Sequence, residues 1–433
     1  MSVPMSVSAQ NLVVSGVAHP AVEVQPEMST GLTALYVVDD ASAATLSYTS
    51  SSGNITWQRF DARGGGFASD VEGLTRNGNT FSIPAGSEDS GYIIDDGSRR
   101  YCFWVVNYAN HRLELDALSV DEAGSECDRT TLTVTGKASA ITYYTINGRP
   151  MELSRAMHLQ YRTLEFSEDA WQQVERDVEV SSTGGHISIQ APLCNTDFRL
   201  SGDRFLQAWG EQEDVVSQSY TTIAVSAETT ATQVAHDADN EGSTGNEGDL
   251  GGSAPAEITF TAYPTDAAIF KEWQFSLTED FEDVRDRYNE ESITRTFTDE
   301  GTIYARFVCA DASGKCTFEG TVYPISIGSS RLECPNAFSP ENQDGVNAEW
   351  KVSYSSIISF ECDIFNRWGI KMAHLSHPSQ GWDGRYKGKF VPSGVYFYVI
   401  KAKGADGKDY SKSGDINIIN SRKGASGAAT PTE

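Results

Sequence analysis

Short runs of β-branched and aromatic residues recur along the whole chain and limit what it can fold into. Examples are residues 35–38, 101–106, 130–134, 187–190, 304–309 and 395–400. Clusters of Gly, Asn, Asp and Ser bound these runs, and turn signals return about every ten residues, a spacing typical of β-sandwiches. Helical patterns are scarce, the clearest being residues 167–174 and 281–288. The sequence therefore predicts an all-β protein made of tandem immunoglobulin-like β-sandwiches.

Length and composition set further limits on the class of protein. The chain has 433 residues, of which 39% are hydrophobic and 10% aromatic, enough for three or four domains with real cores. Its 60 acidic and 33 basic residues give a net charge of -27. Such acidity argues against nucleic acid as a partner, because phosphate binding needs a basic face. No apolar run approaches the roughly 20 residues of a membrane-spanning helix.

Composition also divides the chain into segments. Residues 1–10 resemble the remnant of a secretory signal peptide, since Val7 and Ala9 occupy the small-residue positions that a signal peptidase prefers; an ordinary chain start is the alternative. Residues 229–256 are rich in Gly, Ser and acids, which predicts a flexible linker. The expected domains are a first sandwich at 11–121, a second at 122–228, a third at 257–330, a terminal domain at 331–422 and a disordered tail at 423–433.

Seven cysteines fit an oxidising exterior better than the cytosol. They show no zinc-binding spacing, and their odd number leaves at least one thiol free. Cys309 and Cys316 flank a predicted turn between two strands, so a disulfide across that hairpin is one expectation.

The third segment carries features of a known module. A strand at 258–262, a Trp273-Gln-Phe275 strand and an acidic Gly-Thr corner before the strand at 304–309 resemble polycystic-kidney-disease (PKD) domains. That resemblance implies an Ig-like sandwich used as a spacer or interaction module. The Gly-Asp pair that usually precedes the Trp strand in that family is missing here.

Residues 334–422 hold the densest set of motifs in the chain. They read Pro-Asn-Ala-Phe-Ser-Pro from Pro335, Asp-Gly-Val-Asn from Asp344, Phe-Asn-Arg-Trp-Gly from Phe365, Trp-Asp-Gly from Trp382 and Gly-Val-Tyr-Phe-Tyr from Gly394. The motif residues are Pro335, Asn336, Phe338, Pro340, Asp344, Gly345, Asn347, Phe365, Asn366, Arg367, Trp368, Gly369, Trp382, Asp383, Gly384, Gly394, Val395, Tyr396, Tyr398 and Gly414.

These five motifs, in this order, resemble the gliding-motility-associated (type B) C-terminal domain of Bacteroidetes, a signal of the type IX secretion system. The family usually has an acid after the Asn of Asp-Gly-x-Asn, where this chain has Ala348. The resemblance implies an Ig-like domain and export through the periplasm to the cell surface, the outer membrane or the medium. It implies the type IX translocon and its outer-membrane partner barrels as partners.

The charge distribution fits a separate terminal module. Residues 331–433 hold 13 basic and 11 acidic residues, a balance of +2, whereas the other 330 residues hold 20 and 49, a balance of -29. A near-neutral docking domain on an acidic passenger suits a surface rich in anionic lipopolysaccharide. The alternative is that each module merely stays soluble.

The strand at 394–400 is expected to form the centre of the terminal domain. Tyr396 and Tyr398 share one face, and Val395, Phe397 and Val399 share the other. One face must pack against the core, while the other is covered by a second sheet or offered to the translocation partner. We expect Phe397 to lie in the core. We also expect Gly394 to adopt a backbone conformation that a Cβ would obstruct. A disulfide between Cys334 and Cys362 is predicted to join the first and third strands.

Signs of catalysis are weak, and we expect no catalytic residues, cofactor or metal. The pair His374 and His377 lacks a third ligand nearby, and the acidic pairs Asp39-Asp40 and Asp95-Asp96 sit at turn-like sites. Four aromatic residues are candidates for a sugar platform but more often fill cores: Trp57, Tyr101, Trp104 and Trp209.

Two hypotheses follow. The first is a non-enzymatic surface or secreted protein that acts as an adhesin or interaction module, or as a component or reporter of the secretion machinery; surface polysaccharide or an envelope signalling protein would be its partner. The second is a carbohydrate-binding protein or hydrolase whose site lies in residues 11–228.

Overall fold

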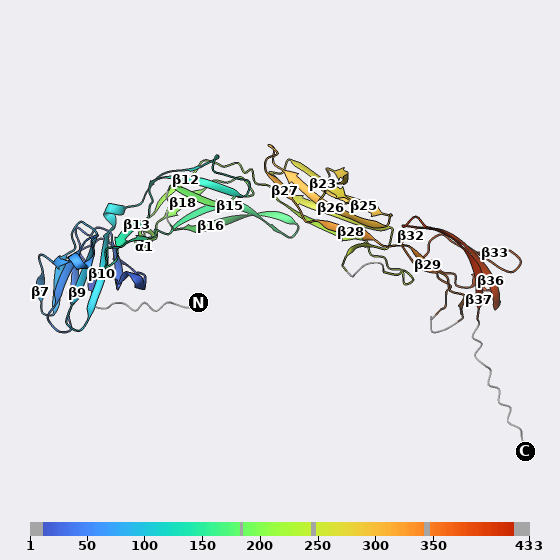
Figure 1. Cartoon of the computed structure of the whole chain (residues 1–433), viewed down its shortest axis with the longest axis horizontal. Coiled ribbons are helices and arrows are strands. Elements are labelled where there is room, and N and C mark those ends of the chain that lie inside the picture. Colours follow the sequence, from blue (N-terminus) through green and yellow to red (C-terminus); the bar gives the residue numbers. More distant parts are fainter. Residues whose placement is uncertain (1–11, 182–184, 244–247, 342–346, 420–433) are drawn as a thin grey trace, which may run out of the picture. The chain divides into compact units, whose positions relative to one another are not determined.

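The computed structural model describes residues 12–181, 185–243, 248–341 and 347–419 (Figure 1). These residues form two compact units, which divide near Ala224. Almost every element is a strand, and the only α-helix among the described residues is the short α1, Arg204–Ala208. None of the helices described is long and apolar enough to cross a membrane. The all-β, multi-sandwich architecture predicted from the sequence is confirmed.

The first sandwich is built from two facing sheets. One has the order β1-β4-β8-β7 and the other β2-β3-β10-β9-β5-β6. Their bounds are β1 Leu12–Ser15, β2 Val22–Val24, β3 Ala34–Val38, β4 Thr45–Thr49, β5 Thr56–Phe60, β6 Ser69–Asp70, β7 Thr75–Asn77, β8 Thr80–Pro84, β9 Ser90–Asp95 and β10 Arg100–Asn107. The central strands β3 and β10 are buried on both faces, which explains their unbroken apolar sequences.

The second sandwich follows without a separate linker. Its main sheets have the orders β11-β12-β17 and β16-β15-β18-β19, beside a β13–β14 hairpin. The bounds are β11 Glu114–Val120, β12 Arg129–Lys137, β13 Ile141–Tyr144, β14 Pro150–Leu153, β15 Met157–Ser167, β16 Ala170–Val180, β17 His186–Gln190, β18 Arg199–Gly202 and β19 Glu213–Val216. Because β11 pairs with β12, the second sandwich begins before the boundary expected at residues 121 and 122.

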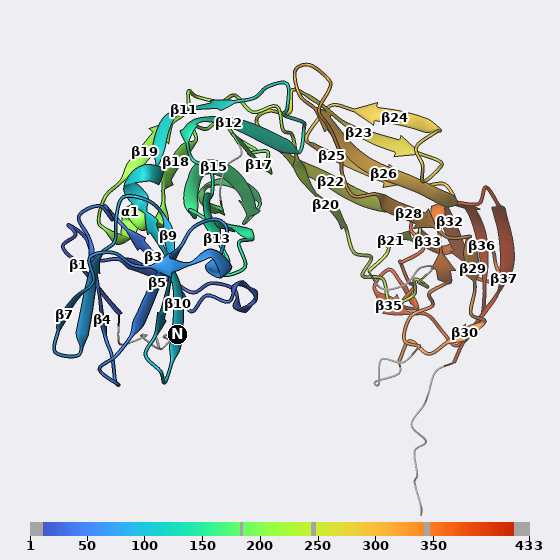
Figure 2. The same cartoon turned by 60° about the vertical axis from the view of Figure 1, so that its left-hand side comes forward.

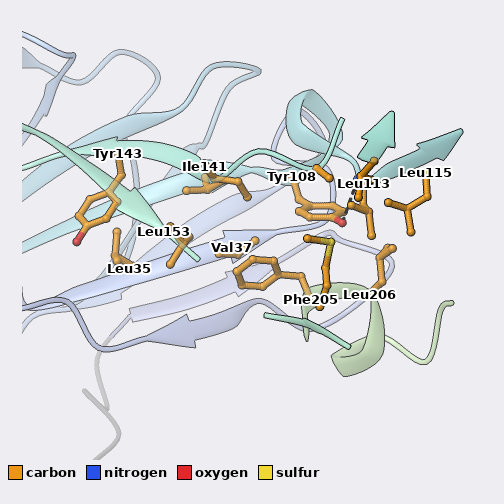
Figure 3. Packing of buried hydrophobic residues seen from close by; sticks show 14 of the residues in the cluster. Leu35, Val37, Tyr108, Leu113, Leu115, Ile141, Tyr143, Leu153, Phe205 and Leu206 are labelled. Atoms are coloured by element: carbon orange, nitrogen blue, oxygen red, sulfur yellow. Dashed lines mark hydrogen bonds between the residues drawn. The ribbon is translucent and has the colours of Figure 1, made fainter. Parts of the chain in front are cut away.

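One hydrophobic core runs through both sandwiches of this unit. Leu35 and Val37 of the first contribute to the same cluster as Ile141, Leu153 and Phe205 of the second. Figure 3 shows these side chains gathered between the elements that carry them. Shared apolar burial of this kind makes the two sandwiches one structural body rather than two domains on a hinge.

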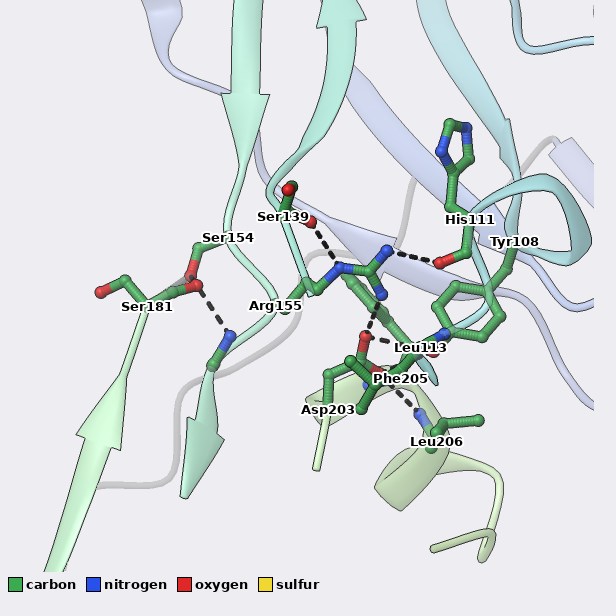
Figure 4. A network of polar contacts seen from close by, with 11 residues as sticks. Tyr108, His111, Leu113, Ser139, Ser154, Arg155, Ser181, Asp203, Phe205 and Leu206 are labelled. Atoms are coloured by element: carbon green, nitrogen blue, oxygen red, sulfur yellow. Dashed lines mark hydrogen bonds and ion pairs between the residues drawn. The ribbon is translucent and has the colours of Figure 1, made fainter. Parts of the chain in front are cut away.

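A buried ion pair lies at the joint between these sandwiches (Figure 4). The Arg155 guanidinium donates to the Asp203 carboxylate at 2.8 Å and to the Ser139 carbonyl at 2.6 Å, and it also donates to the His111 carbonyl. The Arg155 and Asp203 side chains are only 4% and 0% exposed. Tyr108, on the 3₁₀ turn η3 (Tyr108–His111), donates to the same carboxylate at 3.1 Å, and burial raises the pKa of its hydroxyl.

The second unit begins with a third sandwich. Its sheets have the orders β20-β22-β25 and β21-β28-β26-β23-β24, with β27 paired to β26. The bounds are β20 Ala227–Gln233, β21 Leu250–Gly252, β22 Ala256–Pro264, β23 Phe270–Ser276, β24 Val284–Tyr288, β25 Ser292–Phe297, β26 Gly301–Ala310, β27 Thr317–Glu319 and β28 Tyr323–Ile327. Trp273 and Phe275 lie in its core, with Phe260 at centroid distances of 5.4 and 5.3 Å. Assignment of this sandwich to the PKD type stays a prediction.

The prediction of a flexible linker at 229–256 is wrong for much of that segment. Strand β20 pairs along its whole length with β22, and β21 pairs with β28. Between them, the Asn240 side chain donates to the carbonyls of Val352 and Pro378 at 2.7 and 2.8 Å. The segment has few large apolar residues, and strand pairing with its neighbours fixes it, together with burial of Ala254 and Ala256 in the core; composition does not report either.

The terminal domain completes the second unit. Its main sheet has the order β30-β37-β36-β32-β33, and β36 runs between β32 and β37 (Figure 2). The bounds are β29 Arg331–Glu333, β30 Ala337–Phe338, β31 Ser353–Ser355, β32 Ile357–Phe365, β33 Lys371–Leu375, β34 Arg385–Tyr386, β35 Lys389–Phe390, β36 Gly394–Gly404 and β37 Asp409–Ile418. A two-stranded β29–β31 sheet and the loops around Trp350 and Trp382 complete its core.

Candidate functional site

Residues of three motifs, Phe338, Trp382 and Tyr396, meet in one aromatic cluster of the terminal domain. Trp350 and Trp382 pair through their backbones, with N–O distances of 2.9 and 3.0 Å. The Trp382 ring lies 5.5 Å from that of Phe338 and 5.2 Å from that of Tyr396. The chain segments that carry Phe338, Trp382 and Tyr396 are far apart in sequence, so the motifs are brought together by the fold.

Backbone and ring hydrogen bonds tie the first motif to this cluster. The Trp350 indole donates to the Pro335 carbonyl at 2.7 Å, and the Asn417 backbone of β37 donates to the Asn336 carbonyl at 2.9 Å. Asn347 lies at the edge of this arrangement, where its carbonyl accepts from the Ser339 backbone at 2.8 Å. Asp344 and Gly345, from the second motif, lie outside the described residues.

The Phe-Asn-Arg-Trp-Gly motif forms the turn between β32 and β33. The Asn366 side-chain oxygen accepts from the backbone nitrogens of Trp368 and Ile370, both at 3.0 Å. Gly369 has a φ of +77°, which a residue with a Cβ rarely adopts. The Trp368 ring is 71% exposed, and the Arg367 guanidinium lies over it at 4.2 Å. Asn366 and Gly369 therefore build the turn, whereas Arg367 and Trp368 face solvent.

The remaining motif glycines have different surroundings. Gly384 has a φ of +72°, and a Cβ there would lie 2.9 Å from the Pro340 side chain. Asp383 supports this turn by accepting from the Arg385 backbone at 3.0 Å. Gly394 has a φ of +153°, as expected for a special backbone conformation, but the space around its missing Cβ is open. Gly414 lies against Tyr398, whose ring also contacts Trp350 at 5.1 Å.

The assignment of faces on β36 is opposite to the one expected. Tyr396 and Ile400 are buried in the core, and Tyr398 packs against it. Val395, Phe397 and Val399 point to the other side and are 46%, 44% and 45% exposed. The two buried tryptophans, Trp350 and Trp382, meet the tyrosine face, so the core forms there and the expectation that Phe397 lies in it is wrong.

Neither predicted disulfide is formed. Cys309 is a free buried thiol, whereas Cys316 is engaged in a disulfide. The prediction of a disulfide between Cys309 and Cys316 is therefore wrong. Cys309 points into the sandwich core, since it belongs to the cluster around Phe260 and Trp273. Cys334 and Cys362 are also free. Burial raises the pKa of the Cys362 thiol to about 12, and the two side chains serve as apolar members of the core.

Other candidates for chemistry have structural partners. His374 pairs with Asp363 at 2.7 Å, and His377 pairs with Ser379 at 2.7 Å. Asp96 accepts hydrogen bonds in a turn, and the Ser98 hydroxyl is the main reason that the pKa of its carboxyl is lowered. No group of three or more metal-ligating residues occurs among the residues that the structure describes. The four aromatic residues considered as a sugar platform are all buried.

Comparison with known proteins assigns two segments. Residues 332–418 match the family described as the CHU_C type IX secretion signal domain. Residues 119–217 match a fibronectin type III domain, itself a β-sandwich. No curated protein matches the chain. Domains of these two kinds are typically non-catalytic.

Solved structures give only weak global superpositions. The fibronectin(III)-like modules of Clostridium thermocellum CbhA share 11% identity, with 45% of this chain and 97% of that chain covered and a TM-score of 0.19. Three N-terminal domains of the bacteriophage RB49 Hoc protein share 10% identity, with coverages of 72% and 100% and a TM-score of 0.22. Dimeric latent PorU from Porphyromonas gingivalis shares 10% identity, with coverages of 74% and 35% and a TM-score of 0.15. Scores this low support no inference about function. The identity of the terminal domain rests on its family match and its motifs, and by these the chain ends in a type IX secretion signal domain, as an exported cargo of that system does.

Proposed function

We propose that this chain is a non-enzymatic cell-surface or secreted protein whose terminal domain, residues 331–422, directs its passage across the outer membrane. The observation that carries the proposal is the match of residues 332–418 to the secretion-signal family, together with the folded motif cluster around Trp350 and Trp382. The type IX translocon and its outer-membrane partner barrels recognise this domain. The three preceding sandwiches are the passenger.

The passenger acts through binding, as an adhesin or interaction module or as a component or reporter of the secretion machinery. Support comes from its architecture: the first two sandwiches share one core and a buried ion pair, which suits a rigid display element. The fibronectin type III match at 119–217 supports the same role. Burial of Trp57, Trp104 and Trp209 in sandwich cores removes the main argument for a sugar platform in residues 11–228.

Deletion of residues 331–433 should trap the passenger in the periplasm. The first unit has its own core, so the truncated chain keeps a folded part that antibodies can detect. Protease added to intact cells should degrade the full chain, or the full chain should appear in the medium, while the truncated chain stays protected until the outer membrane is opened. Arrival of the truncated chain at the surface or in the medium would disprove the proposed function.

A further inference from the structure

The outer face of the terminal sheet carries a stripe of apolar side chains that no described residue covers. Val395, Phe397 and Val399 are alternate residues of β36, and each is 44–46% exposed. Strand β36 is central in its sheet, hydrogen-bonded to β32 on one side and β37 on the other. A sheet with one solvated face normally alternates apolar residues inward with polar residues outward, so three apolar residues facing out at its centre need an explanation.

The neighbouring strands show that this apolar character is local. Across from the stripe, β37 presents Ser413 opposite Val399 and Asp415 opposite Phe397. On the other side, β32 places Phe365 opposite Phe397, and Phe365 is only partly buried. The apolar surface therefore consists of Val395, Phe397 and Val399 together with the ring of Phe365 on β32. The polar residues of β37 border it on the other side.

Carboxylates lie on both sides of the stripe. Asp363 lies opposite Val399, and its carboxylate pairs with Lys371 at 2.8 Å and His374 at 2.7 Å. On the other edge, the Asp415 carboxylate accepts from the Asn417 amide at 2.8 Å. These carboxylates on both sides of the stripe disfavour an anionic lipid, polysaccharide or nucleic acid surface, although the exposed Lys401 is the next outward residue of β36. The face is suited to an uncharged apolar partner.

The size of the face argues for a transient contact. With about 4.8 Å between strands and about 3.3 Å per residue, an apolar stripe two strands wide and about six residues long presents roughly 200 Å². A complex on it would bury about 400 Å² of apolar stripe and its complement, well below the roughly 1,200–2,000 Å² of stable interfaces. A second copy of the chain would thus form only a weak dimer. Residues 420–433 contain no large apolar side chain, so this segment of the chain is not suited to cover the stripe either.

We propose that the stripe Val395, Phe397 and Val399 is the surface on which an uncharged segment of an export-machinery protein, bearing aliphatic or aromatic side chains, docks transiently during secretion. This inference rests on the proposed function, because it assumes that the terminal domain is handed to such machinery. A brief contact fits that purpose, since the cargo must be released after transport.

The test replaces the apolar atoms without disturbing the strand. In the full chain, Val395→Thr, Phe397→Thr and Val399→Thr are combined, because Thr keeps the preference for a strand while adding a hydroxyl. Export should fall at least tenfold, with folded protein accumulating in the periplasm at an unchanged Tm. An apolar control that combines Val395→Ile, Phe397→Leu and Val399→Ile should be exported normally. So should Lys401→Thr, which changes the next outward residue of the same strand.

Every other outcome would contradict the inference, and some would give the stripe a different role. Normal export of the threonine variant would overturn the inference, and so would a Tm lowered by more than about 5 °C, which would make the stripe a structural element. A wild-type dimer in light scattering that the threonine variant dissolves would assign the stripe to a second copy. Binding of wild type but not variant to phosphatidylcholine vesicles would assign it to lipid. Export of a chain lacking residues 331–433 would instead overturn the proposed function.

Discussion

Trp350→Ala should unfold the terminal domain, whereas Phe397→Ala should leave it folded. Trp350 is fully buried, its indole donates to the Pro335 carbonyl at 2.7 Å, and its ring lies 5.1 Å from that of Tyr398. Truncation of a buried aromatic side chain of this size costs about 3–5 kcal/mol of unfolding free energy. Phe397 points away from this core, so its truncation should cost less than about 1 kcal/mol.

Hydrogen exchange on peptides from β36 and β37 measures this difference within the full chain, because it reports the local free energy of opening. Protection of these strands should be lost in the Trp350 variant and retained in the Phe397 variant. Equal loss in both variants would mean that the core lies on the Phe397 side, contrary to the structure. Periplasmic accumulation of the Trp350 variant would follow from its unfolding and is a weaker test.

Arg155→Ala should destabilise the first unit by about 3–5 kcal/mol, because it leaves the Asp203 carboxylate buried without its cation. It would also leave the Ser139 and His111 carbonyls without their donor. For a unit of this size, a loss of that magnitude lowers Tm by roughly 10 °C.

Arg162→Ala is the matched control. Arg162 pairs with Asp197 at 2.8 Å, but both side chains are about half exposed, so the pair contributes about 0–1 kcal/mol. Calorimetry of the full chain should show a large fall in the transition of the first unit for Arg155→Ala and almost none for Arg162→Ala. Similar melting of the two variants would contradict the role of the buried pair at the joint.

Strand content was predictable from the sequence because β-branched and aromatic runs bounded by turn residues need no distant information. The choice of face on β36 was not predictable in the same way. Both of its faces are apolar or aromatic, and what decides between them is the position of Trp350 and Trp382, which belong to other segments. Alternation shows that a strand has two faces, but it does not show which one another segment will cover.

Two other differences have equally local causes. Residues 167–174 have a helical pattern in the sequence, but they form the end of β15, the hairpin tip and the start of β16; at the tip, Glu168 and Asp169 take positive φ values of 51° and 57°. The motif residues divide in a similar way: Asn366, Gly369 and Gly384 serve the turns, while Arg367 and Trp368 face solvent. Sequence alone shows the motif but not this division of roles.

If the terminal domain carries the export signal, its transfer to another protein should direct that protein across the outer membrane. Residues 225–433 form one compact unit, so they can be joined as a whole to the C-terminus of a folded periplasmic reporter. The measurement is the fraction of reporter that is released to the medium or becomes sensitive to protease on intact cells. The fused reporter should be exported, and the same fusion ending at residue 330 should stay in the periplasm. Retention of the complete fusion in the periplasm, with its terminal domain folded, would contradict this expectation.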